Sequence, residues 1–292
     1  ERYGDHLRAR RCAKRTIYCQ QLDLNALRKA LVADVRSPGE VTLAHLRRYQ
    51  LGLFNRQLAA ATVARVSTHL RMFFRFLFLE ELIATDPGDR LEQPRVPPRP
   101  PGEVLTSGDV QKLLTAALDS RTPLRDRAVL ETLYCTGVRR SELLGIDVCD
   151  LDHRERTLLI RAGKGEKPRV LPVAPTCYDA LQHYLTFGRP PLEREPSPAL
   201  FLGVKGRRLC EAGISRLLHD LGERAGIEKR VTPHCFRRTC ATGLLKNGTN
   251  LKVIQTILGH ESLETTSLYL CLSPDEIREE VLTHHPRERF QA

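Results

Sequence analysis

The sequence predicts a mainly α-helical protein with one small β-hairpin in its C-terminal domain, and three patterns support that prediction. Before residue 93, apolar residues recur at spacings of three and four, which is the period of an amphipathic helix. After residue 103, capping residues and glycines mark where further helices start and stop. One β-rich interval, residues 157–174, interrupts these helices. We therefore expect an N-terminal helical bundle followed by an α+β domain.

A proline-rich stretch separates the two parts. Residues 93–102 read Q-P-R-V-P-P-R-P-P-G, and five prolines in ten residues stop a helix and favour a stiff, extended connector. The 292 residues are enough for two domains, each with its own core. We assign residues 1–93 to the helical domain, 94–102 to the linker and 103–292 to the second domain.

In the first domain we expect helices over residues 16–33, 42–57 and 62–83. The third of these is amphipathic, because its apolar and its polar positions fall on different faces. The apolar face holds Val66, Leu70, Phe73 and Leu77, and the other face holds Arg65, Thr68, Arg71 and Arg75. Such a cationic face either contacts DNA phosphates or is simply solvated.

The net charge of the chain favours the first alternative, that the cationic face contacts DNA. Lys and Arg number 46 against 35 Asp and Glu, for a formal net charge of +11, and the first 95 residues alone hold 17 against 10. A cationic surface binds a polyanion because binding releases condensed counterions.

The cysteines and the lack of export signals bear on the compartment. Nine cysteines without a C-x-x-C pair, no signal peptide and no apolar run of membrane length indicate a reduced, cytoplasmic chain that does not enter a membrane. His234, Cys235, Cys240 and His260 could suggest zinc, but their spacing matches no common finger or ribbon. Small buried thiols explain the cysteines more simply, so we expect no metal.

Local signals place the elements of the second domain. Thr106 and the aspartate three residues later have the spacing of a capping box, so a helix begins there. Another helix covers residues 124–134 and ends at Gly137, and a third begins near Arg140. The runs T-L-L-I and R-V-L-P-V-A bracket A-G-K-G-E-K-P, which predicts a hairpin with Lys164 at or beside its tip.

Thr232 and Pro233 mark another helix start, because a capping hydroxyl precedes a proline at the first helical position, where its missing N–H costs nothing. His234 and Arg237 follow on the first turn and share a face. Unpaired amides and the positive end of the helix dipole make that face a favourable place for a phosphate. The alternative is a histidine that caps locally and an arginine in a surface ion pair.

The last motif combines a histidine and a tyrosine. N-L-K-V-I-Q-T-I-L, with Gly259 as its stop, predicts a helix that places His260 just beyond its C-terminus. Tyr269 lies on or beyond the next short helix, and a lone tyrosine is more often a packed aromatic than a nucleophile. Two arginines, two histidines, one lysine and one tyrosine together nevertheless supply the cations, proton donor and nucleophile that phosphoryl transfer at a phosphodiester needs.

Four motifs in this order resemble those of the tyrosine recombinases, also called phage integrases. They are T-G-V-R-R-S-E-L-L-G-I from Thr136, G-K-G-E-K-P-R from Gly163, H-C-F-R-R-T-C-A-T from His234 and L-G-H-E-S-L-E-T-T-S-L-Y from Leu258. The likeness spans residues 104–285 and is greatest to the simple two-domain Xer-type members. The first domain resembles the family's helical core-DNA-binding domain in pattern and charge. One departure is Arg238, where the family often has histidine.

The resemblance implies a reaction. Tyr269 attacks a DNA phosphate, forms a 3′-phosphotyrosyl link and releases a 5′-hydroxyl, and the reverse attack reseals the strand. Arg139 and Arg237 hold the two non-bridging oxygens, while Lys164 protonates the leaving oxygen. The frame T-G-x-R-x-S-E selects Arg139 rather than the neighbouring Arg140.

The remaining residues have supporting roles by the same resemblance. His234 and His260 assist proton transfer and phosphate binding, and Glu142, three residues after Arg139, orients the pocket. Because the covalent link conserves the energy of the broken bond, neither a metal nor ATP nor any other cofactor is expected.

The resemblance also implies an assembly and a role. The two domains close round double-stranded DNA at a specific core site, and four protomers form a homotetramer on paired sites, with or without a second recombinase or an accessory DNA-bending protein. Residues 273–286 dock onto a neighbouring protomer or form an intramolecular terminal helix. We expect a cytoplasmic enzyme, nucleoid-associated when bound to DNA, that integrates, excises or transposes a mobile element. The alternatives are Xer-type chromosome-dimer resolution, a type IB topoisomerase and a non-catalytic DNA-binding relative.

Overall fold

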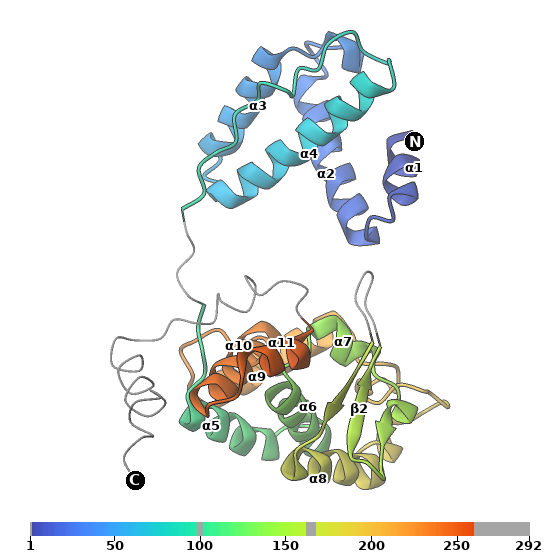
Figure 1. Ribbon diagram of the computed structural model, residues 1–292, viewed down its shortest axis with the longest axis vertical. Coiled ribbons are helices and arrows are strands. Elements are labelled where there is room, and N and C mark those ends of the chain that lie inside the picture. The colour runs from blue at the N-terminus through green and yellow to red at the C-terminus, as the bar shows by residue number, and fades with distance from the viewer. Residues whose placement is uncertain (1, 98–101, 162–167, 260–292) are drawn as a thin grey trace, which may run out of the picture. The chain divides into compact units, whose positions relative to one another are not determined.

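The computed structural model describes residues 2–97, 102–161 and 168–259, and the chain divides into two compact units, residues 1–99 and 100–292 (Figure 1). The predicted fold class is confirmed, since helices make up most of the described residues and one small antiparallel sheet lies in the second unit. Within the described ranges, no helix is both long enough and apolar enough to cross a membrane.

The first unit is a bundle of helices. Its elements are α1 (Arg2–Ala9), α2 (Lys14–Leu31), α3 (Leu43–Asn55) and α4 (Ala60–Leu79), with a short 3-10 turn at Pro38–Glu40. Three of these were predicted, with ends that differ by at most four residues, and α1 was not. On α4 the predicted apolar face is confirmed: Val66, Leu70 and Leu77 are buried, and Phe73 packs against the same core.

The second unit is built round one central helix. Its helices are α5 (Ser107–Leu118), α6 (Pro123–Thr136), α7 (Arg140–Gly145), α8 (Pro175–His183), α9 (Glu211–Arg224), α10 (Pro233–Lys246) and α11 (Leu251–Leu258). Shorter turns cover Val148–Asp150, Tyr184–Gly188 and Pro190–Leu192. Helix α6 packs against α5, α8 and α10, so its apolar residues are buried on several sides.

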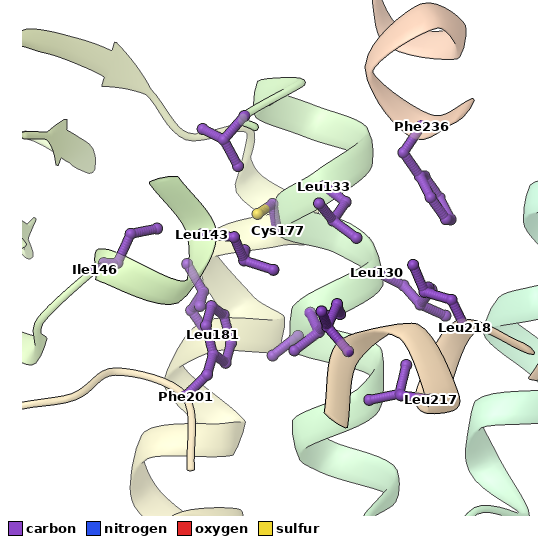
Figure 2. Close-up of a cluster of buried hydrophobic side chains, with 14 of the residues drawn as sticks. Leu130, Leu133, Leu143, Ile146, Cys177, Leu181, Phe201, Leu217, Leu218 and Phe236 are labelled. Carbon is purple, nitrogen blue, oxygen red and sulfur yellow. The ribbon is translucent and has the colours of Figure 1, made fainter. Parts of the chain in front are cut away.

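Figure 2 shows how this core closes. Leu130 and Leu133 of α6 meet Leu181 of α8, Leu218 of α9 and Phe236 of α10 in one apolar cluster, and each of these side chains is 1% exposed or less. Complete burial of such a side chain is worth roughly 2 kcal/mol. The core therefore fixes the ends of α6 and α10, from which the candidate site residues project.

The sheet has the antiparallel order β1-β2-β3, formed by β1 (Leu151–Asp152), β2 (Thr157–Ile160) and β3 (Arg169–Pro172). The predicted hairpin is confirmed as β2 and β3, whose register pairs Ile160 with Arg169 and Leu158 with Leu171. Strand β1 was not predicted. Lys164 lies in the connection between β2 and β3, outside the described residues.

The predicted starts and stops of helices are also confirmed. Thr106 and Asp109 form a capping box, with hydrogen bonds of 2.9 and 3.1 Å. The hydroxyl of Thr232 accepts a hydrogen bond of 3.1 Å from the backbone N–H of Cys235 and caps α10. Gly137 ends α6 with φ of +58°, and a Cβ there would lie 2.9 Å from the side chain of Leu258, so this turn favours glycine for two reasons.

Candidate active site

The chain turns at Gly137 after α6, and Arg139 is the residue that precedes α7. Its backbone N–H donates to Oε2 of Glu142 at 2.8 Å, and its Nη1 donates to Oε1 of the same carboxylate at 2.9 Å. Its Nη2 donates to the backbone carbonyl of Gly259, at the end of α11, at 3.0 Å. The Arg139 side chain keeps 31% of its surface exposed. The neighbouring Arg140 pairs with Glu211 of α9 instead.

Arg237 projects from α10, one turn after His234, and is only 3% exposed. Its Nη1 donates to the carbonyl of Gly137 at 2.8 Å, and its Nη2 donates to the carbonyl of Leu258 at 2.6 Å. Arg139 and Arg237 therefore bind consecutive carbonyls at the C-terminal end of α11, those of Gly259 and Leu258. The last carbonyls of a helix lack partners within the helix and carry the negative end of its dipole, so cations are stabilising there.

A third arginine, Arg169 at the start of β3, completes this arrangement. Its Nε donates to the carbonyl of Ile257 at 2.8 Å, and its Nη1 and Nη2 donate to the two oxygens of Glu142, each at 2.9 Å. The sequence reasoning missed this residue. A signal was present, because Arg169 falls on the same side of its strand as Leu171, and alternate residues of a strand share a face.

Glu142 is the anion between two of these guanidinium groups, and its side chain is 4% exposed. Burial alone would raise the pKa of this carboxyl. Hydrogen bonds from Arg169 and from the backbone and side chain of Arg139 outweigh burial and lower the pKa to about 2. The carboxylate is therefore ionised at neutral pH and balances part of the charge of Arg139 and Arg169.

His234 lies on α10 one turn before Arg237 and is exposed. Partial desolvation, followed by the positive charges of Arg238 and Arg237, lowers the pKa of this imidazole below its ordinary value. Without a bound anion, His234 is therefore neutral at pH 7 and can accept a proton.

The structure brings Arg139, Glu142 and Arg237 together round the end of α11, with His234 on the same helix as Arg237. The other predicted catalytic residues, Lys164, His260 and Tyr269, lie outside the described residues. In the sequence, His260 follows Gly259, the residue whose carbonyl Arg139 binds.

The predicted DNA-contacting face of α4 is in part already paired within the protein. Arg65 forms an ion pair with Asp23 of α2, and Arg75 lies over the ring of Phe78, 5.7 Å from its centre. Thr68 donates a hydrogen bond of 3.0 Å to the carbonyl of Ala64. Arg65, Thr68 and Arg75 are exposed and Arg71 is half-buried, and the role of this face remains a prediction.

The cysteines beside the site donate to backbone carbonyls. The thiol of Cys235 lies 3.4 Å from the carbonyl of Glu103, and that of Cys240 lies 3.7 Å from the carbonyl of Cys135. Among the residues that the structure describes, no group of three or more His, Cys, Asp and Glu side chains is arranged to hold a metal ion.

Residues 103–276 match the model of the phage integrase family, which is more than half of the chain. The chain is 35% identical to the tyrosine recombinase XerC of Halalkalibacterium halodurans, over 93% of this chain and 91% of that protein. It is 37% identical to the tyrosine recombinase XerD of Mycobacterium tuberculosis, over 98% of this chain and 97% of that protein.

Solved structures support the same fold. One is the Tn1549 transposon integrase in complex with a circular intermediate DNA, with a TM-score of 0.75 and 21% identity over 96% of this chain and 98% of that one. Another is the XerH site-specific recombinase bound to a palindromic difH substrate, with the same TM-score and identity over 94% of this chain and 81% of that one. The chain belongs to the phage integrase family of tyrosine recombinases, enzymes that cleave and rejoin DNA through a phosphotyrosine intermediate.

Proposed function

We propose that this chain is a site-specific recombinase in which Tyr269 is the nucleophile and Arg139 and Arg237 bind the scissile phosphate. The observation that supports this assignment best is the placement of both guanidinium groups on consecutive carbonyls of Leu258 and Gly259, the two residues that precede His260. Arg139 and Arg237 therefore lie close together, at the residues that precede His260 in the sequence. Binding of one phosphate by both arginines requires such proximity.

Electrostatics explain why such a site would accelerate strand cleavage. Attack on a phosphodiester concentrates negative charge on the non-bridging oxygens, and a guanidinium stays charged at every relevant pH. Arg139 and Arg237 are anchored by protein hydrogen bonds of 2.6–3.0 Å, so little reorganisation accompanies the reaction. A fixed pair of cations stabilises the transition state more than a pair that must first be ordered.

Proton transfer is assigned to three further residues. Lys164 protonates the leaving 5′-oxygen, and the neutral imidazole of His234 is suited to accept a proton and to bind the phosphate once Tyr269 is in place. His260 assists from the position after Gly259. Glu142 holds Arg139 and does not contact the phosphate. No step requires a metal or ATP.

We further propose that double-stranded DNA with a specific core site is the substrate and that four protomers act on two paired sites. The helical first unit would bind the DNA through α4, and residues 273–286 would dock onto a neighbouring protomer. The Tn1549 integrase was solved with a circular intermediate DNA, which favours integration, excision or transposition of a mobile element. The relatives named XerC and XerD favour the second candidate, chromosome-dimer resolution in the cytoplasm on the nucleoid.

The deciding experiment is covalent trapping. The protein is incubated with nicked suicide substrates made from the flanks of its own gene, and adducts that survive SDS are separated on a denaturing gel. We expect an adduct with the wild type and with Tyr18→Phe, an exposed tyrosine in α2, and none with Tyr269→Phe. DNA binding without an adduct on any flanking sequence would favour the non-catalytic alternative.

A second assay addresses the topoisomerase alternative and the role. A topoisomerase would relax a supercoiled plasmid that lacks the core site, whereas a recombinase requires paired sites. Plasmids that carry either the flanks of a mobile element or a candidate site of chromosome-dimer resolution then distinguish the two proposed roles, according to which pair of sites recombines. Deletion of residues 273–286 with full recombination retained would exclude the docking proposal.

A further inference from the structure

We propose that Arg169 is a positioning residue of the recombination reaction, which holds Glu142 and the last turn of α11 so that Arg139 is aligned for the phosphate. The inference rests on the proposed function, because Arg139 is a phosphate ligand only within that proposal. Arg169 itself lies outside the set of residues that contact DNA.

The geometry of Arg169 argues for an indirect role. Its side chain is 10% exposed, and all three guanidinium nitrogens donate to protein groups: Nε to Ile257 and the two Nη atoms to Glu142. With Nε and both Nη atoms donating to protein groups, this guanidinium joins three segments, the base of the hairpin, helix α7 and helix α11.

Glu142 transmits the effect to Arg139. Oε1 of this carboxylate accepts hydrogen bonds from Nη1 of both Arg139 and Arg169, each at 2.9 Å. Oε2 accepts from the backbone N–H of Arg139 and from Nη2 of Arg169, at 2.8 and 2.9 Å. Arg169 therefore occupies half of the accepting capacity of Glu142 and fixes the plane of the carboxylate.

Removal of Arg169 would change what Arg139 does. The freed carboxylate could rotate and take both Nη atoms of Arg139 in a bidentate pair, which is the preferred geometry of arginine with a carboxylate. That movement would withdraw Nη2 of Arg139 from the carbonyl of Gly259, 3.0 Å away, and from the phosphate in the proposed complex. Arg169 thus prevents Glu142 from capturing the catalytic arginine.

The contact with α11 gives Arg169 a second constraint on the same region. Arg169, Arg237 and Arg139 bind the successive carbonyls of Ile257, Leu258 and Gly259. A Cβ at Gly259 would lie 2.9 Å from Nη1 of Arg169, so the guanidinium packs directly against this glycine. A lysine cannot reproduce this pattern, because a single ammonium cannot bind both carboxylate oxygens in a fork and the Ile257 carbonyl as well.

The first test compares cleavage with DNA binding. We expect Arg169→Gln to form the Tyr269 adduct about 100-fold more slowly, since a small misplacement of a catalytic group costs that much. Arg169→Lys should also lose at least roughly tenfold, because it retains the charge and loses the fork. The affinity for core-site DNA should stay within roughly twofold, because many phosphate contacts determine it.

The matched control is Arg161→Gln. Arg161 follows β2 on the same hairpin and pairs with Asp147 and Asp150 at 2.7 and 2.8 Å, away from Glu142. It should cleave at the wild-type rate. Thermal unfolding of each variant establishes that it is folded at the assay temperature. If Arg169→Gln is unfolded there, Arg169→Lys and the crossed variants below decide the question.

Two further readouts separate positioning from a general structural role. If Arg169 acts through Glu142, then Arg169→Gln should add little to the loss already caused by Glu142→Gln, and independent losses would contradict the inference. The second readout is a substrate with sulfur in place of the bridging 5′-oxygen, whose thiolate leaves without a general acid. We expect no rescue of Arg169→Gln by this substrate. Rescue would mean that Arg169 serves the Lys164 segment instead, and would overturn the proposal.

The two proposals fail in distinguishable ways. Absence of any Tyr269 adduct from the wild-type protein would count against the proposed function. If the wild type forms the adduct and Arg169→Gln and Arg169→Lys form it at the same rate, only the positioning role of Arg169 is contradicted.

Discussion

Arg237 in the second unit and Arg75 in the first are both predicted to meet DNA, yet the protein holds them differently. Arg237 is 3% exposed, and its two Nη atoms donate to the carbonyls of Gly137 and Leu258. Arg75 is exposed on α4, with the ring of Phe78 beneath it. The same side chain is fixed by the backbone in one unit and left adaptable in the other.

The difference separates two uses of a positive charge. A guanidinium fixed in a site of low solvent content stabilises charge that develops in a transition state, because it need not reorganise. An exposed arginine gains little from any single contact, is screened by salt and contributes to affinity together with its neighbours. We therefore expect substitutions in the second unit to change the rate of cleavage, and substitutions on α4 to change affinity and its dependence on salt.

The largest effect should come from Arg237→Gln. The variant removes the positive charge and both guanidinium hydrogen bonds to the carbonyls of Gly137 and Leu258, so adduct formation should fall by about 10³-fold. DNA affinity, measured by fluorescence anisotropy, should change by less than roughly threefold. Equal losses in affinity and in rate would contradict the distinction between the two units.

The next effect concerns stability and its dependence on pH. The pKa of Glu142 is about 2 in the folded chain and 4.5 ordinarily, so ionised Glu142 stabilises the fold by about 3 kcal/mol above pH 4.5. This contribution is lost as the pH falls from 4.5 toward 2. In urea titrations the wild type should exceed Glu142→Gln in free energy of unfolding by about that amount at pH 7 and by about half of it or less at pH 3. A difference that is the same at both pH values would refute this account of the carboxylate.

Gly259→Ala should have a smaller effect on cleavage, and the same substitution at Gly248 should have none. Gly259 has φ of +67°, and a Cβ there would meet Nη1 of Arg169 at 2.9 Å. Gly248 has φ of +76° with nothing within 4 Å, so Gly248→Ala carries the same backbone strain without the collision. Both variants should lose roughly 1–2 kcal/mol of stability, and only Gly259→Ala should also cleave about tenfold more slowly. Similar cleavage by both would mean that the contact with Arg169 is unimportant.

These residues also mark what the sequence could predict. The hydroxyls of Thr106 and Thr232 and the glycines at 137 and 259 act within a few residues of themselves, so local rules located the helix ends correctly. Helix α9 was not located; its N-cap residue, Cys210, makes no side-chain cap. Arg139 and Arg237 were found because four motifs in order resemble a family.

Arg169 was missed for a different reason. Its partners Glu142 and Ile257 are 27 and 88 residues away along the chain, and only the tertiary fold brings the Arg169 side chain to both. Strand alternation indicates that Arg169 shares a face with Leu171, but no local rule identifies Glu142 and Ile257 as its partners. The family motifs predict which residues would perform the chemistry, whereas a residue proposed to position them is visible only in the tertiary structure.

The smallest effect should come from the α4 face. Arg65→Gln and Arg75→Gln should each weaken DNA binding roughly two- to fivefold and reduce the slope of log affinity against log salt by about one, with cleavage of bound DNA unchanged. Asp23 accepts from both Arg65 and His69, so it holds Arg65 away from full engagement with DNA.

Asp23→Asn should therefore have the opposite sign and tighten binding. The matched control is Asp34→Asn, which removes the same charge from the first unit. Asp34 pairs with Arg48 of α3, whereas Asp23 pairs with Arg65 of α4. Both variants raise the net charge equally, so any general electrostatic gain is shared. A larger gain for Asp23→Asn, abolished when Arg65→Gln is added, would place Arg65 on DNA. Equal gains would mean that Arg65 remains a solvated residue and that the DNA-contacting part of the first unit lies elsewhere.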